Sequence, residues 1–154
     1  MNVFLRNSMN VDLNQYLCFN LYRGWREISS FYKDILGKDI SLQNVYILDL
    51  CDLHEKITMN DLSEAMHLDG SAISTLVSRM EKKSLLKRTH SREDRRFVYV
   101  QLTQQGHDFK EKVKSKSSFL AANIKKNISM DEIKQLQAIV NKIAANRLDF
   151  KDSV

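Results

Sequence analysis

Residues 69–106 read DGSAISTLVSRMEKKSLLKRTHSREDRRFVYVQLTQQG, and this stretch decides the fold. Residues 71–83 are predicted to form a helix, because apolar side chains recur at helical spacing. This stripe consists of Ile73, Leu76, Val77 and Met80. Residues 85–89 and 97–102 are predicted to be two strands of a hairpin, the second showing apolar alternation with period two. Residues 91–96 form its polar tip, and a further helix is predicted from Thr103.

The segments before this stretch complete a recognisable unit. Two helices are predicted from caps and apolar spacing, one from Ser41 to about Leu53 and a short one from Met59 to Met66 with Thr58 as its cap. The short helix and the helix 71–83 are separated only by a turn at residues 67–70. This arrangement predicts a helix-turn-helix, and the hairpin that follows would be its wing.

Long helices are predicted at both ends of the chain. The first spans residues 12–36, with Asp12 as its N-cap and Gly37 beyond its C-terminus. Two more follow Thr103, and the second is predicted to begin with a capping box of Ser129 and Glu132. Their apolar stripes are hard to bury in a chain of 154 residues, so a homodimer with interlocking terminal helices is expected. The alternative is a monomer that folds these helices over its own core.

The expected fold class is therefore mainly α with a small β-hairpin wing. Residues 1–154 would form a single domain. Within it, residues 42–102 would be the winged helix-turn-helix, and residues 12–37 and 103–148 the helical dimerisation region. The first nine residues do not resemble a signal peptide, and no stretch approaches the ~18 apolar residues of a membrane span. We expect a cytoplasmic protein without a membrane partner, whose two cysteines are free thiols.

Basic charge is concentrated in one place. Between Arg79 and Arg96 there are eight Lys or Arg and three Asp or Glu residues, a net charge of +5. The whole chain also carries +5, so the remaining residues are neutral as a set. A local basic footprint of this kind favours a polyphosphate partner, and double-stranded DNA fits the predicted fold.

The chain resembles the MarR family of bacterial transcription regulators. Residues 94–106 (DRRFVYVQLTQQG) are similar to the family pattern D-x-R…V-x-L-T-x-x-G, and residues 76–85 (LVSRMEKKSL) to its L-x-x-L-E-x-x-G-L pattern. Ser84 stands where glycine is usual. The resemblance implies a transcriptional regulator, by default a repressor, that binds a pseudo-palindromic operator as a homodimer. It also implies that Arg96 enters the minor groove and that Asp94 orients it through a salt bridge.

Short hydroxyl side chains on the exposed face of the helix 71–83 suit the major groove, because they permit close approach. The candidates for this contact are Ser71, Ser74, Thr75, Ser78 and Arg79. Further basic side chains are candidates for phosphate contacts: Lys87, Arg88, Arg92 and Arg95. The alternative for each is a solvated surface position. An architectural protein that coats DNA without sequence preference is a remote alternative for the whole chain.

Candidate residues for sensing an oxidant or a small molecule lie in the first predicted helix. Cys18, with Tyr22 and Tyr32 on the same side of the predicted helix, resembles the site of the family's thiol-based organic-hydroperoxide regulators. Residues 41–44 (SLQN) depart from that subgroup, which usually has Thr-Tyr-Pro-Gln there. Cys18 would otherwise be a small apolar core residue. A small molecule bound near Trp25 and the tyrosines is a further possibility.

Catalysis is not expected. The sequence contains no Gly-rich phosphate loop, no nucleophile elbow and no Cys or His set with metal-ligand spacing. We therefore predict neither an enzyme nor a cofactor or metal.

Overall fold

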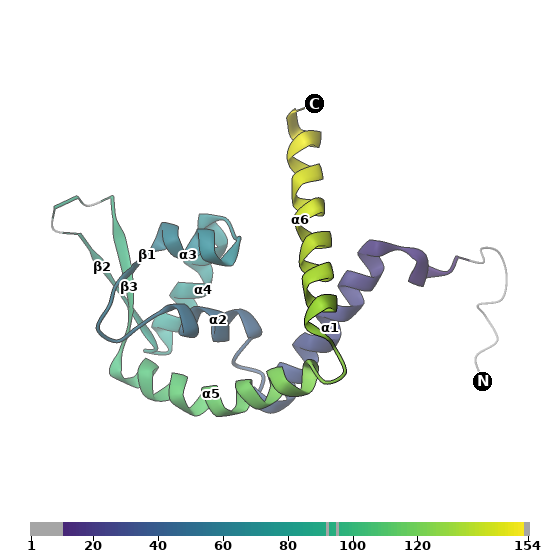
Figure 1. Cartoon of the computed structure of the whole chain (residues 1–154). Coiled ribbons are helices and arrows are strands. Elements are labelled where there is room, and N and C mark those ends of the chain that lie inside the picture. Colours follow the sequence, from purple (N-terminus) through teal and green to yellow (C-terminus); the bar gives the residue numbers. More distant parts are fainter. Residues whose placement is uncertain (1–10, 92, 95, 153–154) are drawn as a thin grey trace, which may run out of the picture. The chain divides into compact units, whose positions relative to one another are not determined.

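The computed structural model describes residues 11–91, 93–94 and 96–152, with side chains to residue 147 (Figure 1). The chain divides into two compact units, the first ending at Ser117 and the second beginning at Ser118. Helices predominate, and a small antiparallel sheet lies in the first unit, so the expected fold class is confirmed. No helix in the described part combines the length and apolar character needed to cross a membrane.

The N-terminal helix begins later than predicted. Residues Leu13–Gln15 form a short 3-10 helix, η1, which Asp12 caps by accepting a hydrogen bond from the N–H of Asn14 at 3.0 Å. Tyr16 is extended, and α1 then runs from Leu17 to Leu36. The amide of Asn20 donates to the carbonyl of Tyr16, which stabilises the break. At the other end, Gly37 adopts a φ of 88° as the predicted C-terminal glycine.

Helix α2, Leu42–Leu50, begins with a capping box in which Ser41 and Asn44 exchange hydrogen bonds. It ends three residues before the predicted position. The carboxylate of Asp52 accepts from the N–H of His54 at 2.8 Å and shapes a turn, while the carbonyl of Asp52 accepts from the N–H of Leu102 at 2.8 Å. These contacts lead the chain into strand β1, Ile57–Thr58, which was not predicted.

The helix-turn-helix is confirmed. Helix α3, Met59–Met66, starts with a capping box between Thr58 and Asp61 and ends at His67 in the left-handed conformation. Helix α4, Gly70–Lys82, follows directly, with Asp69 accepting from the N–H of Ala72 at 2.8 Å. The apolar stripe of α4 is buried as predicted, together with side chains from α2, α3 and the sheet. This core of the first unit includes Val45, Ile47, Leu48, Leu62, Ile73, Val77, Met80, Leu86, Val100 and Leu102.

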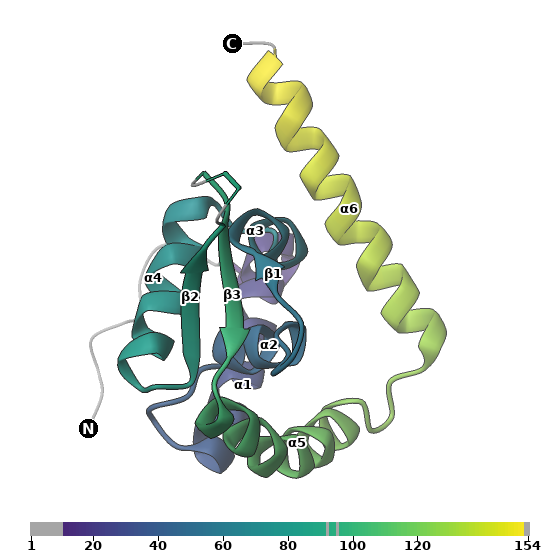
Figure 2. The same cartoon turned by 90° about the vertical axis from the view of Figure 1, so that its left-hand side faces the viewer.

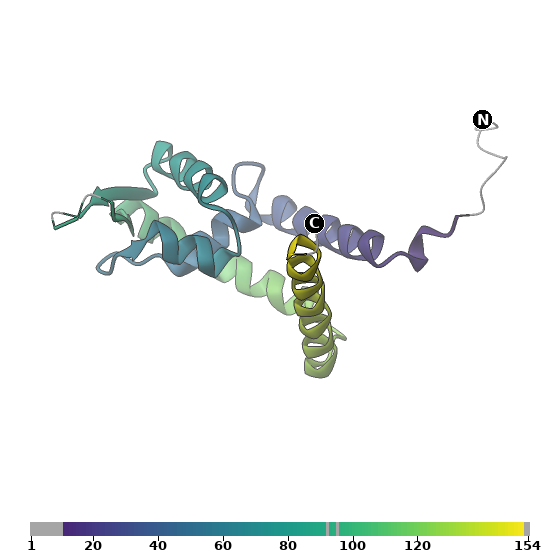
Figure 3. The ribbon, with the colours of Figure 1, turned by 90° about the horizontal axis from the view of Figure 1, so that it is seen from above.

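The sheet has the order β1-β3-β2, with β2 at Leu86–His90 and β3 at Val98–Leu102. Both pairings are antiparallel, and Val100 lies opposite Ile57 on one side and Arg88 on the other. Figure 2 shows β2 and β3 side by side with α4 against them. The hairpin extends beyond the helices of the helix-turn-helix, as the view from above also shows (Figure 3).

Helix α5, Gln104–Ile124, crosses from the first unit into the second. Helix α6, Met130–Asp152, begins with the predicted capping box, because Ser129 and Glu132 exchange hydrogen bonds. Large apolar side chains of the second unit are exposed. They include Phe119, Ile128, Met130, Leu136, Ile139, Val140 and Ile143.

Ser84 has a φ of 57°, the left-handed conformation in which glycine is favoured. The residue that stands where the resembled family has glycine therefore adopts a glycine geometry. Because an L side chain is strained there, Ser84→Gly is expected to stabilise the protein by about 1 kcal/mol. Thermal unfolding should show a rise of roughly 2–4 °C. Ser84→Ala retains the Cβ and should bring no such gain, and a lower melting temperature for Ser84→Gly would contradict the interpretation.

Candidate nucleic-acid interface

Helix α4 presents one stripe of exposed polar residues. Ser71, Thr75 and Arg79 are spaced four residues apart, and all three are exposed. The hydroxyl of Ser71 donates to Asp69 at 2.6 Å, and that of Thr75 donates to the Ser71 carbonyl at 3.0 Å. Each hydroxyl oxygen keeps lone pairs that can accept a further hydrogen bond, while Arg79 adds a donor. This stripe has the chemistry to approach base edges.

Ser74 and Ser78 lie differently from the other candidates on α4. Both are half-buried. Their hydroxyls are close to the guanidinium of Arg88 on β2, at 3.5 Å for Ser74 and 3.1 Å for Ser78. Three of the five candidates on this helix are therefore exposed to solvent, and the other two, Ser74 and Ser78, face the wing strand.

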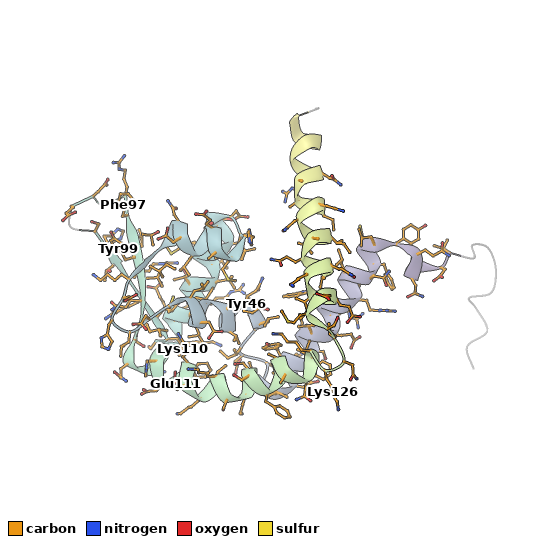
Figure 4. All side chains as sticks on the ribbon, in the orientation of Figure 1. Tyr46, Phe97, Tyr99, Lys110, Glu111 and Lys126 are labelled. Carbon is orange, nitrogen blue, oxygen red and sulfur yellow. The ribbon has the colours of Figure 1, made fainter. Side chains whose placement is uncertain are left out.

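The wing tip is organised by local hydrogen bonds. The hydroxyl of Ser91 accepts from the N–H groups of Glu93 at 3.2 Å and Asp94 at 3.3 Å. The N–H of Ser91 donates to the carbonyl of Phe97 at 2.9 Å, and the N–H of Phe97 donates to that of Asp94 at 3.0 Å. Figure 4 marks Phe97 and Tyr99 at this outer end of the hairpin. In its described residues the tip is thus a turn that is held by hydrogen bonds of Ser91 and Phe97.

Asp94 and Arg96 form a two-pronged ion pair at this tip. Oδ2 of Asp94 accepts from Nη2 of Arg96 at 2.7 Å and from Nε at 3.0 Å, while Oδ1 accepts from the Arg96 backbone N–H at 2.9 Å. The Arg96 side chain holds the pKa of the Asp94 carboxyl below its usual range, and the backbone bond adds to this effect. The side chain of Arg96 nevertheless remains 89% exposed. One edge of its guanidinium is therefore fixed and the other faces solvent.

The remaining basic candidates have different surroundings. Lys87 is exposed on β2. Arg92 and Arg95 lie outside the described residues. Arg88 was expected at a phosphate, but its side chain lies against α4 and forms an ion pair with Glu81 at 3.2 Å.

Two contacts that attach this unit to α5 were missed from the sequence. The hydroxyl of Thr103 accepts from the N–H of Gly106 at 2.9 Å, and the N–H of Thr103 donates to the carbonyl of Leu85 at 3.1 Å. Nζ of Lys110, which Figure 4 labels on α5, donates to the carbonyls of Asp49 and Cys51 at the end of α2, at 3.3 and 3.0 Å. Thr103 and Gly106 are only three residues apart, but the other partners lie 18 to 61 residues apart in the chain, so no local pattern indicates those contacts.

The candidate sensing residues are not gathered in one place. Cys18 is exposed, and it lies in the first turn of α1 rather than two turns inside a longer helix. Tyr22 and Trp25 are exposed, and the Tyr22 ring lies 6.0 Å from the guanidinium of Arg26. Tyr32 is buried, and burial raises its pKa, with Tyr46 and Asp49 of α2 adding to the effect. Fourteen residues of helix, about 21 Å, separate Cys18 from Tyr32.

The two cysteines are expected to differ in reactivity. Burial raises the pKa of the Cys51 thiol to about 12, against a smaller opposing effect of Lys110. At pH 8 only about one Cys51 thiol in ten thousand is then ionised. Ellman's reagent at pH 8 should therefore detect one fast thiol per native chain, and none in Cys18→Ser. Equal rates for both thiols in the native protein would contradict this assignment.

Among the residues described, no group of three or more His, Cys, Asp or Glu side chains could hold a metal ion. The features that stand out are the exposed stripe of α4 and the oriented arginine of the wing. The first places polar side chains on the solvent-exposed face of α4, and the second places positive charge at the end of the hairpin. This arrangement suits a groove-shaped, negatively charged partner.

Comparisons with known proteins agree with this geometry. A family model described as MarR family matches residues 38–96. The organic hydroperoxide resistance transcriptional regulator of Bacillus subtilis is 36% identical over 104 residues, which cover 67% of this chain and 71% of that protein. The HTH-type transcriptional regulator MgrA of Staphylococcus aureus is 28% identical over 134 residues, or 86% of this chain and 90% of MgrA.

Solved structures show the same fold. The PcaV transcriptional regulator from Streptomyces coelicolor, in complex with its natural ligand, matches with a TM-score of 0.77 and 17% identity, covering 90% of this chain and 98% of that one. MepR of S. aureus, in a complex with DNA, matches with a TM-score of 0.71 and 20% identity, covering 85% and 98%.

Proposed function

This chain belongs to the MarR family of DNA-binding transcriptional regulators, and from that membership we propose that it is a repressor that reads a specific operator. It binds a pseudo-palindromic site as a homodimer, with α4 in the major groove and the wing in the minor groove. Its half-sites lie about one helical turn apart, because two symmetric copies must meet the same face of the duplex.

The observation that carries this proposal is the geometry of Arg96. Its guanidinium is held by Asp94 along one edge and is 89% exposed, at the tip of a projecting hairpin. A narrow A·T-rich minor groove concentrates negative potential, and arginine is the side chain that fits it best. An arginine that is oriented before binding loses less side-chain entropy when it enters the groove.

The outward stripe of α4 supports base reading. Ser71, Thr75 and Arg79 are exposed on one face and are short or flexible enough to meet base edges or phosphates. Lys87, Arg92 and Arg95 would add phosphate contacts. A protein that only coats DNA needs charge but no such face of hydroxyls, so sequence-specific binding is favoured over an architectural role.

Exposed apolar side chains support the homodimer. On α6, Leu136, Ile139, Val140 and Ile143 follow helical spacing and are all exposed. On α1, Leu17, Trp25 and Phe31 are exposed as well. Water-facing stripes of this length favour association, and a closed symmetric dimer buries the same patch on both copies.

Fluorescence anisotropy on the DNA upstream of the protein's own gene tests the proposal. With excess nonspecific competitor, a sequence-specific regulator stays on the labelled operator, because specific sites are typically 10³–10⁷-fold tighter than nonspecific DNA. Loss of all binding under competition would instead identify an architectural protein. Footprints at a single asymmetric site would overturn the dimeric, pseudo-palindromic arrangement.

Oxidation of Cys18 is a second candidate function, as the signal that releases the operator. The exposed position of Cys18 in the first turn of α1 favours it. So does the likeness to a regulator named for organic hydroperoxide resistance. A mild organic hydroperoxide should then release operator DNA from the wild type but not from Cys18→Ser. If release is absent in both, the signal is a small-molecule effector or none.

A further inference from the structure

We propose that Arg88 is a positioning residue that fixes the recognition helix α4 against the wing strand β2, and that it does not bind DNA itself. This inference rests on the proposed operator binding and deepens it. It assigns Arg88, which counts toward the basic footprint of the sequence, a role opposite to that of Arg96.

The guanidinium of Arg88 contacts three residues on one side of α4, over about two helical turns. Nη2 donates to the carbonyl of Ser74 at 2.8 Å, and Nη1 donates to the hydroxyl of Ser78 at 3.1 Å. Nη1 also lies 3.2 Å from Oε2 of Glu81. One side chain of the wing thus contacts residues 74, 78 and 81, which lie along the inward side of the helix. A planar guanidinium with donors in a fixed fork makes such a set of bonds possible.

Glu81 completes the connection from the helix side. Its Oε1 accepts from the backbone N–H of Arg88 at 3.0 Å, so the same carboxylate bonds both the main chain and the side chain of one residue. Strand β2 is an edge of the sheet, because the strand order is β1-β3-β2. An N–H on the open side of an edge strand needs a partner, and Glu81 provides it. Helix and wing are therefore joined through backbone as well as side chain.

Charge and exposure separate Arg88 from the arginine proposed for the minor groove. The Arg88 side chain is 25% exposed and that of Glu81 is 29% exposed, whereas Arg96 is 89% exposed. To reach a phosphate, Arg88 would have to leave Glu81, and that carboxylate would then stand half-buried without its cation. Leaving one member of such a pair uncompensated is strongly unfavourable.

Operator reading needs the stripe of α4 and the wing tip to meet two grooves at once. Their relative placement decides whether both contacts form on the same duplex, and misplacement by about 1 Å is enough to weaken a site built on precise geometry. Arg88 and Glu81 therefore act on specificity. Nonspecific binding depends on the summed positive charge and tolerates a looser arrangement.

Two mild variants distinguish positioning from phosphate binding. Arg88→Lys keeps the positive charge, so a phosphate contact would survive it, but an ammonium cannot hold Ser74, Ser78 and Glu81 together. Glu81→Gln removes a negative charge, so it should strengthen DNA binding if Arg88 is a phosphate ligand. If Arg88 is a positioning residue, both variants should weaken operator binding by roughly tenfold while nonspecific affinity changes little.

The measurement is anisotropy on operator and on nonspecific DNA over a salt series. Lys87→Ala is the matched control, since Lys87 is the exposed neighbour on the same strand. It should lower both affinities together and reduce the salt slope by ~0.9, the signature of a lost phosphate contact. Arg88→Lys and Glu81→Gln should leave the slope unchanged. Melting temperatures of all variants, recorded in parallel, set an assay temperature at which each is folded.

Either of two results would overturn the inference: tighter operator binding by Glu81→Gln, or wild-type affinity for operator in Arg88→Lys. A wild-type protein that shows no preference for any operator would instead overturn the proposed function on which the inference rests.

Discussion

Gly106→Ala is expected to lower the free energy of unfolding by about 3 kcal/mol and the melting temperature by roughly 10 °C. A Cβ at this position would overlap the carbonyl oxygen of Leu85 and lie 2.8 Å from its carbonyl carbon. Both are backbone atoms, so no side chain can turn away to make room. The same oxygen accepts from the N–H of Thr103, and the N–H of Gly106 is bonded to the Thr103 hydroxyl. Relief of the overlap would break this joint between α5 and the residue preceding β2.

Circular dichroism at 222 nm during heating measures the effect, and Gly70→Ala is its control. Gly70 opens α4, and a Cβ built there meets no atom within 4 Å. Its replacement should change stability by no more than about 0.5 kcal/mol. Equal melting temperatures for Gly106→Ala and Gly70→Ala would show that the joint has more freedom than the packing indicates.

Elements that depend on near neighbours in the chain were predicted well. The capping residue Thr58 contacts Asp61, three positions away, and Ser129 contacts Glu132 over the same interval. Helix α3 was therefore predicted with its observed bounds. The end of α2 and strand β1 were not, because they depend on Asp52 and Leu102, which are joined only in the folded chain. The start of the predicted helix 12–36 is an exception among local features, because Tyr16 is extended and separates η1 from α1, a break that apolar periodicity does not reveal.

In the candidate site, too, the local contact was predicted and the longer-range contacts were not. Asp94 and Arg96 are two residues apart, and their predicted salt bridge is present. Arg88 belongs to the same basic run, yet its partners lie on another element 7 to 14 residues away. A count of charges treats these arginines alike, whereas exposure and ion-pair partners show that Arg88 and Arg96 have different surroundings. The L-T-x-x-G pattern was recognised only by resemblance, and the contact between Gly106 and Leu85 supplies its physical reason.

Arg96→Ala is expected to weaken operator binding by more than tenfold, a loss above the ~1.4 kcal/mol that this factor represents. The variant removes the guanidinium that would occupy the minor groove, together with its charge. Stability should change little, because the side chain is 89% exposed. Anisotropy at one fixed salt concentration measures the loss, and unchanged affinity would remove the wing from the interface.

Asp94→Asn separates orientation from charge in the same site. Deleting a carboxylate next to DNA should strengthen binding if only net charge matters. If Asp94 acts by holding Nε and Nη2 of Arg96, the variant should weaken operator binding although the protein becomes more positive. Arg96→Lys completes the set, since lysine keeps the charge but lacks the planar fork that Asp94 grips. If operator affinity rises in Asp94→Asn and is unchanged in Arg96→Lys, the wing contributes to binding only through its positive charge. A loss of operator affinity in both variants would establish that the wing binds DNA through the oriented guanidinium of Arg96.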